Sequence, residues 1–232
     1  MKMTAVQVLE AFRIISDYYR SRFDVKSMVY KPIPYIYAKY PSEEELYALF
    51  RMSAQLVSRG LSSTISLSSP LGLVESRKSG LRKACREGLD FVSDGNLETF
   101  WNILDEVLYD CHSLHPVHSV EELKLLCRRF PDTIRLFSVL SSDGEMLAGT
   151  LVFDFGDVVH TQYIAANKRG KASGALDLLI SKLILEVYSD RKYFDFGIST
   201  ECGGTILNEG LIFQKEGFGG RGVCYDIYEI PL

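Results

Sequence analysis

Hydrophobic residues recur along the first part of this chain at two different spacings. Between residues 4 and 22 they recur at steps of three and four residues, which predicts an amphipathic helix. Residues 25–37 are rich in β-branched and aromatic side chains and predict a strand. Because Pro32 and Pro34 remove backbone donors from that strand, we expect it at a sheet edge or with a bulge.

Two further elements and a basic segment follow. Ser42 and Glu45 have the spacing of a capping box and predict the start of a helix. Residues 61–67 alternate between apolar and polar side chains and predict a strand. Residues 75–87 predict a basic helix, and Gly88 stands where a helix cap is expected. The first part of the chain therefore reads helix, strand, helix, strand, followed by a linker helix.

The remainder of the chain also alternates between the two periods. Consecutive strand patterns are joined by short turns, one of which is only Gly156 and Asp157, and this predicts an antiparallel meander. A strongly amphipathic helix follows a polar loop at residues 167–173. The predicted strands are 89–92, 133–140, 146–155, 158–166, 192–198 and 221–230; the predicted helices are 97–111, one capped by Ser119 and Glu122, 176–187, and a short one that ends at 214–220.

This order of elements predicts an α+β fold with a mixed, mostly antiparallel sheet flanked by helices. The chain has 232 residues, of which 47% are hydrophobic and 24% charged, so it can bury one large or two small cores. Its formal net charge of −4 argues against DNA or another nucleic acid as a partner. Any polyanion would have to bind a local basic patch.

Cysteine usage and hydropathy bear on the compartment. The 5 cysteines show no Cys-x-x-Cys pair and no regular spacing, so we expect free thiols in a reducing compartment. No apolar stretch is long enough to span a bilayer, which favours a soluble cytoplasmic protein. His112, His115 and His118 lie close in sequence, but no complete set of ligands accompanies them, and no metal site is predicted.

The C-terminal region carries the most distinctive motifs. The strings YFDFGIST and LNEGLIFQKEGFGGRGVCYDIYEI place several polar residues near one end of a predicted sheet, where α/β proteins usually build their sites. These segments resemble the C-terminal half of acyltransferases of the GNAT superfamily, and most closely the acetyltransferases related to Fem-type (FemAB-like) aminoacyl ligases. The resemblance implies a GNAT fold, with acetyl-CoA or another acyl-CoA as co-substrate and an amine as acceptor.

Fem-type enzymes are tandem GNAT repeats, and the resemblance implies a division of this chain into three parts. Residues 1–74 look like the back half of a first repeat, residues 75–88 form the linker helix, and residues 89–232 form a GNAT-like acyltransferase domain. A partial N-terminal repeat would leave a sheet edge and an apolar face uncovered. We therefore expect a homodimer contact, domain borrowing or an incomplete chain.

GNAT enzymes hold the diphosphate of acyl-CoA on backbone amides at the start of the helix after the fourth strand. The matching segment here is basic and contains two glycines and a serine. It departs from the family pattern Arg/Gln-x-x-Gly-x-Gly/Ala, because Ala172 stands where the first glycine is expected. The alternative is a plain solvated helix start. The candidate cofactor-binding residues are Arg169, Gly170, Lys171, Ala172, Ser173 and Gly174.

Direct acyl transfer needs a base for the amine, donors for the thioester carbonyl and a proton source for the thiolate. His160 is a suitable base and Tyr163 a suitable acid; strand alternation puts His160 with Gln162 on one face and Tyr163 on the other. Asp195, between two phenylalanines, predicts a buried carboxylate with a partner or a catalytic role. Lys215 matches the family lysine near the acceptor site. The structural alternatives are a satisfied sheet histidine, a core tyrosine, and an ion pair of Asp195 with Lys215 or Arg221.

Four residues are candidates for binding the acceptor. Arg82 lies on a cationic stripe of the linker helix, in a segment that resembles the one bordering the acceptor groove of Fem-type enzymes. Glu201, Asn208 and Glu209 flank Lys215 and have side chains that suit a sugar or an amine. The alternative for all four is a solvated surface position.

Three functions remain open at this point. The first is an N-acyltransferase that moves an acyl group from acyl-CoA to an amine of a small molecule or of a cell-envelope, glycan or peptide precursor. The second is a Fem-type ligase that uses aminoacyl-tRNA, although the chain lacks the long helical hairpin of such ligases and is negatively charged. The third is a GNAT-like module that binds without catalysis.

Overall fold

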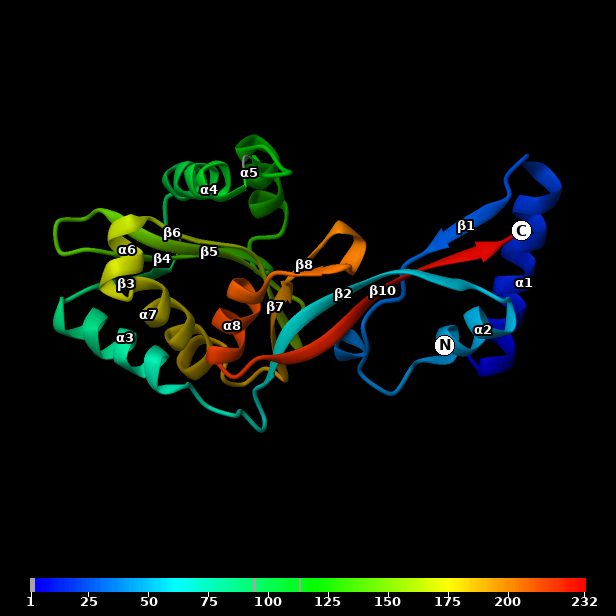
Figure 1. The fold of residues 1–232 in the computed structure, drawn as a ribbon, viewed down its shortest axis with the longest axis horizontal. Helices are drawn as coiled ribbons and strands as arrows, with labels where there is room; N and C mark the ends of the chain where they lie inside the picture. The colour runs from blue at the N-terminus through cyan, green and yellow to red at the C-terminus, as the bar shows by residue number, and fades with distance from the viewer. Residues whose placement is uncertain (1–2, 94, 113) are drawn as a thin grey trace. The chain divides into compact units, whose positions relative to one another are not determined.

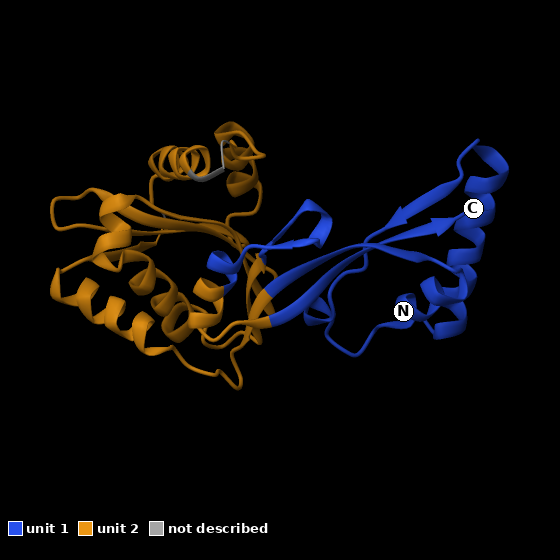
Figure 2. Cartoon of the chain, viewed as in Figure 1, with its two compact units in different colours: residues 1–62, 198–212, 222–232 blue, residues 63–197, 213–221 orange. Residues whose placement is uncertain are grey.

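The computed structural model describes residues 3–93, 95–112 and 114–232, except for the side chains of residues 111 and 112. Its elements form two compact units (Figure 1, Figure 2): residues 1–62, 198–212 and 222–232 make up unit 1, and residues 63–197 and 213–221 make up unit 2. Each unit is assembled from stretches that are separate in the sequence. Strands β2 (Gln55–Ser66) and β10 (Arg221–Pro231) each begin in one unit and end in the other.

Unit 1 begins with a capped helix and a short edge strand. Helix α1 (Ala5–Arg22) starts at Thr4, which exchanges side-chain hydrogen bonds with Gln7 in a capping box. Strand β1 (Ser27–Tyr30) pairs antiparallel with β10. The strand predicted at residues 25–37 was therefore too long, because the chain leaves the ladder before the two prolines. The remaining elements that lie wholly in unit 1, apart from the second helix, are η1 (Tyr35–Tyr37), β8 (Thr200–Glu201), η3 (Cys202–Gly204) and β9 (Ile206–Leu207).

The second helix of unit 1 corrects another prediction. Helix α2 (Glu44–Arg51) has Glu43 at its N-cap, without a side-chain cap, so the predicted capping box of Ser42 and Glu45 does not form. Glu45 instead accepts a hydrogen bond from the Tyr30 hydroxyl. Its carboxylate is therefore not available to accept from the backbone at the start of the helix. A small core joins α1, α2 and β10 through the buried residues Phe12, Ala48, Leu49 and Ile230.

Unit 2 holds the larger core and most of the predicted elements. The antiparallel meander is confirmed, with β3, β4, β5 and β6 pairing in that order, and β7 then pairs parallel with β6. The elements are α3 (Glu75–Arg86), β3 (Asp90–Ser93), α4 (Leu97–His112), α5 (Val120–Arg129), β4 (Ile134–Leu140), β5 (Met146–Asp154), β6 (Val158–Ala166), α6 (Lys168–Ser173), α7 (Ala175–Lys182), η2 (Leu183–Val187) and β7 (Tyr193–Ile198), with α8 (Glu209–Gly217) ending in this unit.

Helices cover both faces of the unit 2 sheet (Figure 1). One core lies between the sheet and helices α3 and α7, and includes the buried side chains of Leu147, Val152 and Leu179. The other lies under α4 and α5 and includes Phe100, Leu123 and Leu151. Alternate residues of the meander enter these two cores, which fixes the register of each strand. No helix in the described part of the chain is long and apolar enough to cross a membrane.

Candidate functional site

Strands β6 and β7 pair over a short distance and then separate. The parallel ladder joins Val158 to Tyr193, Val159 to Phe194 and His160 to Asp195, and it ends there although β6 continues to Ala166. Just beyond Asp195, Gly197 has φ +73°, a left-handed conformation that side chains rarely adopt. The last paired position of the ladder therefore stands where two neighbouring strands diverge.

A histidine and a carboxylate meet at this last position. His160 Nδ1 lies 2.8 Å from Asp195 Oδ2, and the Thr64 hydroxyl donates to Asp195 Oδ1 at 2.7 Å. The Asp195 side chain is 0% exposed, whereas the His160 side chain is 18% exposed. An ionised Asp195 accepts from Nδ1–H, and this leaves Nε2 as the basic nitrogen of the ring. The buried carboxylate of Asp195 thus fixes the orientation of the partly exposed His160 ring.

A lysine, Lys215, also acts on this pair through its charge. Its Nζ donates to the Gly197 carbonyl at 2.8 Å, and the residue is 5% exposed. Burial lowers the pKa of Lys215 to about 8, and the negative charge of Asp195 opposes that shift. The sequence left open that Asp195 only forms a structural ion pair with Lys215 or Arg221. In the structure the Asp195 carboxylate also accepts hydrogen bonds from His160 and Thr64.

A bulge in β6 changes which residues share a face with His160. The register pairs Phe153 with His160 and Leu151 with Tyr163, so Gln162 is an extra residue on β6. Phe153 and Leu151 both belong to the core under α4 and α5. His160 and Tyr163 consequently face the same side of the sheet, and the prediction that they lie on opposite faces was wrong. Plain alternation failed because the inserted residue resets it.

Tyr163 is held in place by neighbours that the sequence did not link to it. Its hydroxyl lies 2.6 Å from Nδ1 of His118, and its ring meets Trp101 edge to face with centroids 5.2 Å apart. Burial raises the pKa of the Tyr163 hydroxyl. Tyr163 is thus part of the packing under α4 and is also hydrogen-bonded to a histidine.

The segment predicted as a phosphate-binding loop is helical, which corrects the prediction of a polar loop at residues 167–173. Asn167 caps α6, and its side-chain oxygen accepts from the Gly170 amide at 2.7 Å. A Cβ at Gly170 would lie 2.1 Å from the Leu147 carbonyl oxygen. At Gly174, where φ is +77°, it would lie 2.3 Å from the Gly80 carbonyl oxygen. Both glycines are therefore needed for close packing of α6 and α7 against β5 and α3.

The polar side chains of α6 are engaged locally. Arg169 donates to Asp143 at 3.1 Å and to Glu145 at 2.6 Å. The Ser173 hydroxyl is buried and donates to the Gly170 carbonyl. Lys171 and Ala172 are exposed. Arg169 and the Gly170 amide therefore already have partners within the chain.

The predicted acceptor residues occupy surface and capping positions. Arg82 on α3 pairs with Glu75 at 2.6 Å and both side chains are exposed. In unit 1, the Asn208 side chain accepts from the Leu211 amide and donates to Glu201 at 3.0 Å. Asn208 therefore caps the start of α8. Glu209 is exposed in the first turn of that helix.

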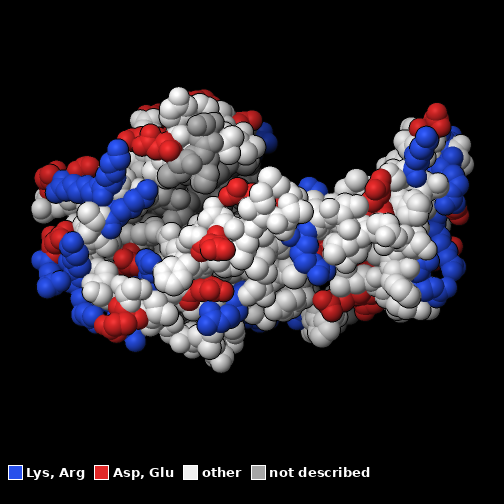
Figure 3. All heavy atoms as spheres, in the orientation of Figure 1, with Lys and Arg blue, Asp and Glu red and all other residues white. Residues whose placement is uncertain are grey.

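Two features limit other kinds of site. Among the described residues, no group of three or more His, Cys, Asp or Glu side chains is placed to hold a metal ion. His115 pairs with Asp105, and the side chain of His112 lies outside the described residues. On the face drawn in Figure 3, acidic and basic side chains are intermixed over unit 2, so this face presents no broad basic surface.

Thr64 and His118 are the contacts of the site that were not predicted. Thr64 lies in a strand whose neighbours Ser62 and Ser63 are also buried, so a run of small hydroxyl residues between apolar ones was the available signal. His118 gave no such signal, because its partner Tyr163 is distant in sequence.

Comparison with known proteins identifies the fold. Residues 76–203 match the family model described as an acetyltransferase (GNAT) domain. A search of curated proteins found no match. Among solved structures, FemX has a TM-score of 0.72 at 11% identity and covers 97% of this chain and 77% of its own.

Two other solved structures are similar over most of this chain. L-PGS from Bacillus licheniformis has a TM-score of 0.64 at 13% identity, covering 96% of this chain and 72% of its own. A tandem GNAT protein from the clavulanic acid biosynthesis pathway has a TM-score of 0.50 at 9% identity, covering 97% and 69%. At these identities the likeness shows the fold alone.

Proposed function

The chain belongs to the GNAT acetyltransferase family, whose fold the sequence predicted, and from this membership we propose that it transfers an acyl group from an activated donor to an amine. The observation that carries the proposal is the His160–Asp195 pair at the position where β6 and β7 diverge. A partly exposed imidazole bonded to a buried carboxylate is a geometry suited to general base catalysis. The pair lies within the segment that matches the family model.

In the proposed reaction, Nε2 of His160 takes a proton from the acceptor amine as its nitrogen attacks the acyl carbonyl. The new C–N bond forms, the bond from the acyl carbon to the leaving sulfur or oxygen breaks, and the leaving group takes up a proton. Asp195 orients the ring and stabilises the imidazolium that forms. Thr64 positions Asp195 through their 2.7 Å hydrogen bond.

Lys215 and Tyr163 have supporting roles in the proposal. The Lys215 cation offsets negative charge near Asp195, and the Gly197 carbonyl fixes its position. Tyr163 faces the same side of the sheet as His160 and is the candidate proton source for the leaving group. Gln162 is the extra residue of the bulge, where the ladder between β5 and β6 is locally disrupted. We propose that the acyl carbonyl binds at this part of the backbone.

Acyl-CoA is the first donor to test, because GNAT domains typically use it. CoA would supply the activated thioester. Because Arg169 and the Gly170 amide already have partners within the chain, we give residues 168–174 no part in donor binding in this proposal. The alternative donor predicted from the sequence, an aminoacyl-tRNA, holds its acyl group as an ester and is tested beside acyl-CoA.

The acceptor, the assembly and the compartment are proposed from the sequence. We propose an amine of a small molecule or of a cell-envelope, glycan or peptide precursor as the acceptor. A homodimer in the cytoplasm remains the expected state. Size-exclusion chromatography with light scattering measures the assembly, and a single monomeric mass across concentrations would contradict the dimer.

The test is an acyl-transfer assay with acetyl-CoA, with a short acetyl thioester and with aminoacyl-tRNA, each against a panel of amines. Free thiol release reports the thioester donors, and labelled amino acid reports the ester donor. Turnover that His160→Gln abolishes supports the proposal. Binding of a donor without turnover by any amine would favour the non-catalytic alternative instead.

A further inference from the structure

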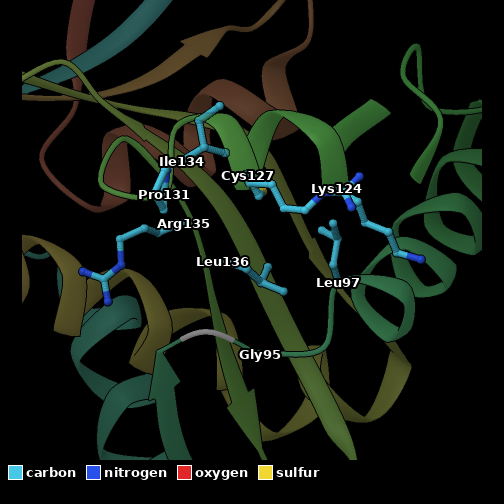
Figure 4. A pocket seen from close by; sticks show the side chains of 9 residues that line it. Gly95, Leu97, Lys124, Cys127, Pro131, Ile134, Arg135 and Leu136 are labelled. Atoms are coloured by element: carbon cyan, nitrogen blue, oxygen red, sulfur yellow. The ribbon is translucent and has the colours of Figure 1, made fainter. Parts of the chain in front are cut away.

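A cavity of about 440 Å³ lies in unit 2 between α5, the start of α4 and strand β4 (Figure 4). None of the candidate catalytic residues lines it, so it is distinct from the proposed acyl-transfer site. Its volume falls within the range of about 300–1,000 Å³ that is usual for small-molecule sites. The cavity therefore has the size of a ligand site and no role in the reaction described above.

The interior of the cavity is aliphatic. Leu136 and Ile134 on β4 face it from the core side of the sheet, and Leu97 at the start of α4 and Cys127 on α5 close it from the helical side (Figure 4). Burial raises the pKa of the Cys127 thiol, which keeps that side chain neutral. No aromatic ring is among the described lining residues, so the walls suit a flexible alkyl chain.

Among the described residues that line the cavity, every charged side chain is basic. Lys124, Arg128 and Arg135 line it, and no Asp or Glu is among the described lining residues. Lys124 already pairs with Glu98 and Glu121, and Arg135 stacks over the Phe137 ring with its guanidinium pointing away in Figure 4. Arg128 is exposed on α5, and no described carboxylate lies within ion-pair distance of it. One planar cation therefore stands beside the aliphatic walls without a carboxylate of the described chain.

We propose that this cavity binds a small molecule with an aliphatic chain and a terminal carboxylate. The chain would fill the space between Leu97, Ile134 and Leu136, and the carboxylate would accept two parallel hydrogen bonds from Arg128. A cationic ligand is disfavoured by the charge of Arg128, which no described carboxylate offsets. A neutral chain would fill the same space but would gain no charge-assisted hydrogen bond from Arg128.

The experiment uses the full chain and decanoate below its micellar concentration as the probe. Isothermal titration calorimetry measures its affinity for the wild type, for Arg128→Glu and for the matched control Arg129→Glu. Arg129 neighbours Arg128, is also exposed, and does not line the cavity, so both variants change the net charge equally. We expect saturable binding that weakens by about tenfold or more in Arg128→Glu and stays within about twofold in Arg129→Glu.

Alkylation of Cys127 supplies an independent readout of where the probe sits. Peptide-resolved mass spectrometry follows the labelling of Cys127 and, as an internal control, of the exposed Cys224 in unit 1. Decanoate should slow the labelling of Cys127 and leave Cys224 unchanged. Equal binding of decan-1-ol, equal weakening by the two arginine variants, or no protection of Cys127 would each overturn the proposal. These outcomes do not depend on acyl transfer.

Discussion

The end of the β6–β7 ladder and the start of α6 are near each other in the chain, and they satisfy their polar groups in different ways. At the ladder end, His160 and Thr64 converge on a fully buried carboxylate, and the histidine ring is partly exposed. At α6, Arg169 pairs with surface carboxylates, and the Gly170 amide donates to the side chain of Asn167. The first arrangement leaves a basic side chain partly exposed, and in the second the arginine and one amide already have partners within the chain. A basic, glycine-containing segment is therefore weaker evidence for a site than a carboxylate that has to be buried.

The largest expected effect is at the base. His160→Gln keeps a polar side chain of similar size but removes the basic nitrogen, so kcat/KM for acyl transfer should fall by about 10²–10⁴-fold. Steady-state thiol release measures it. Far-ultraviolet circular dichroism checks that the fold is kept, and a folded variant with unchanged kcat/KM would remove His160 from the mechanism.

A smaller loss of activity is expected when the anchor of the ring is altered. Asp195→Asn weakens the hold on Nδ1 and misplaces the imidazole, which should lower kcat/KM by about 100-fold. The same change disturbs the buried hydrogen bond from Thr64 and the partly buried one with His160, and should cost about 1–3 kcal/mol in the free energy of unfolding. Urea denaturation measures the stability.

Thr64→Val serves as the comparison for Asp195→Asn. It removes only the hydroxyl that donates to Asp195 and keeps the shape of the side chain. We expect a stability loss of about 1 kcal/mol and a smaller fall in kcat/KM. Loss of activity equal to that of His160→Gln would mean that Thr64 acts on the substrate rather than on Asp195.

The next effect concerns stability at alkaline pH. The pKa of Lys215 is about 8 in the fold, and an unfolded lysine has a pKa of about 10.4. Between these values the unfolded chain binds more protons at this residue, so its contribution to the free energy of unfolding rises with pH, by about 3 kcal/mol in total. Below pH 8 the contribution is constant.

The variant Lys215→Met isolates the contribution of this lysine to the pH dependence of stability. The difference in the free energy of unfolding between wild type and variant should shift in favour of the wild type as pH rises through this window. Urea denaturation at several pH values from neutral to alkaline measures it, and the subtraction cancels the other titrating groups. A difference that is independent of pH would contradict a buried, deprotonating Lys215.

The smallest expected effect is at α6. If turnover with acetyl-CoA is found, Arg169→Gln should change its KM by less than about twofold, because the guanidinium is engaged by Asp143 and Glu145. A short acetyl thioester without the nucleotide should react with a similar kcat/KM. If Arg169→Gln raised the KM for acetyl-CoA strongly but not that for the short thioester, α6 would bind the diphosphate. The two regions would then both be parts of the site.

Much of the fold could be read from the sequence, because local signals agreed with the final packing. The meander was fixed by tight turns such as Gly156-Asp157, and the Ser119–Glu122 capping box forms as predicted. The strand that ended early and the capping box that failed at Glu45 depended on long-range partners, a ladder with β10 and the Tyr30 hydroxyl.

The candidate site was predictable only in part, for related reasons. Asp195 was identifiable because a carboxylate in an apolar strand needs a partner. Its partners His160 and Thr64 come from other strands, and their pairing is a property of sheet order that the sequence does not state. The bulge at Gln162 also left no clear signal, yet it decides that Tyr163 shares a face with His160.

The most direct test of the central claim is the pH dependence of kcat/KM for the wild type and for His160→Gln. The ratio of kcat/KM for the wild type to kcat/KM for His160→Gln cancels the protonation of the acceptor amine, which is common to both. If His160 takes the proton from the amine, this ratio should fall as the pH is lowered, because a base acts only in its unprotonated form. A ratio that does not change with pH would contradict a base at His160.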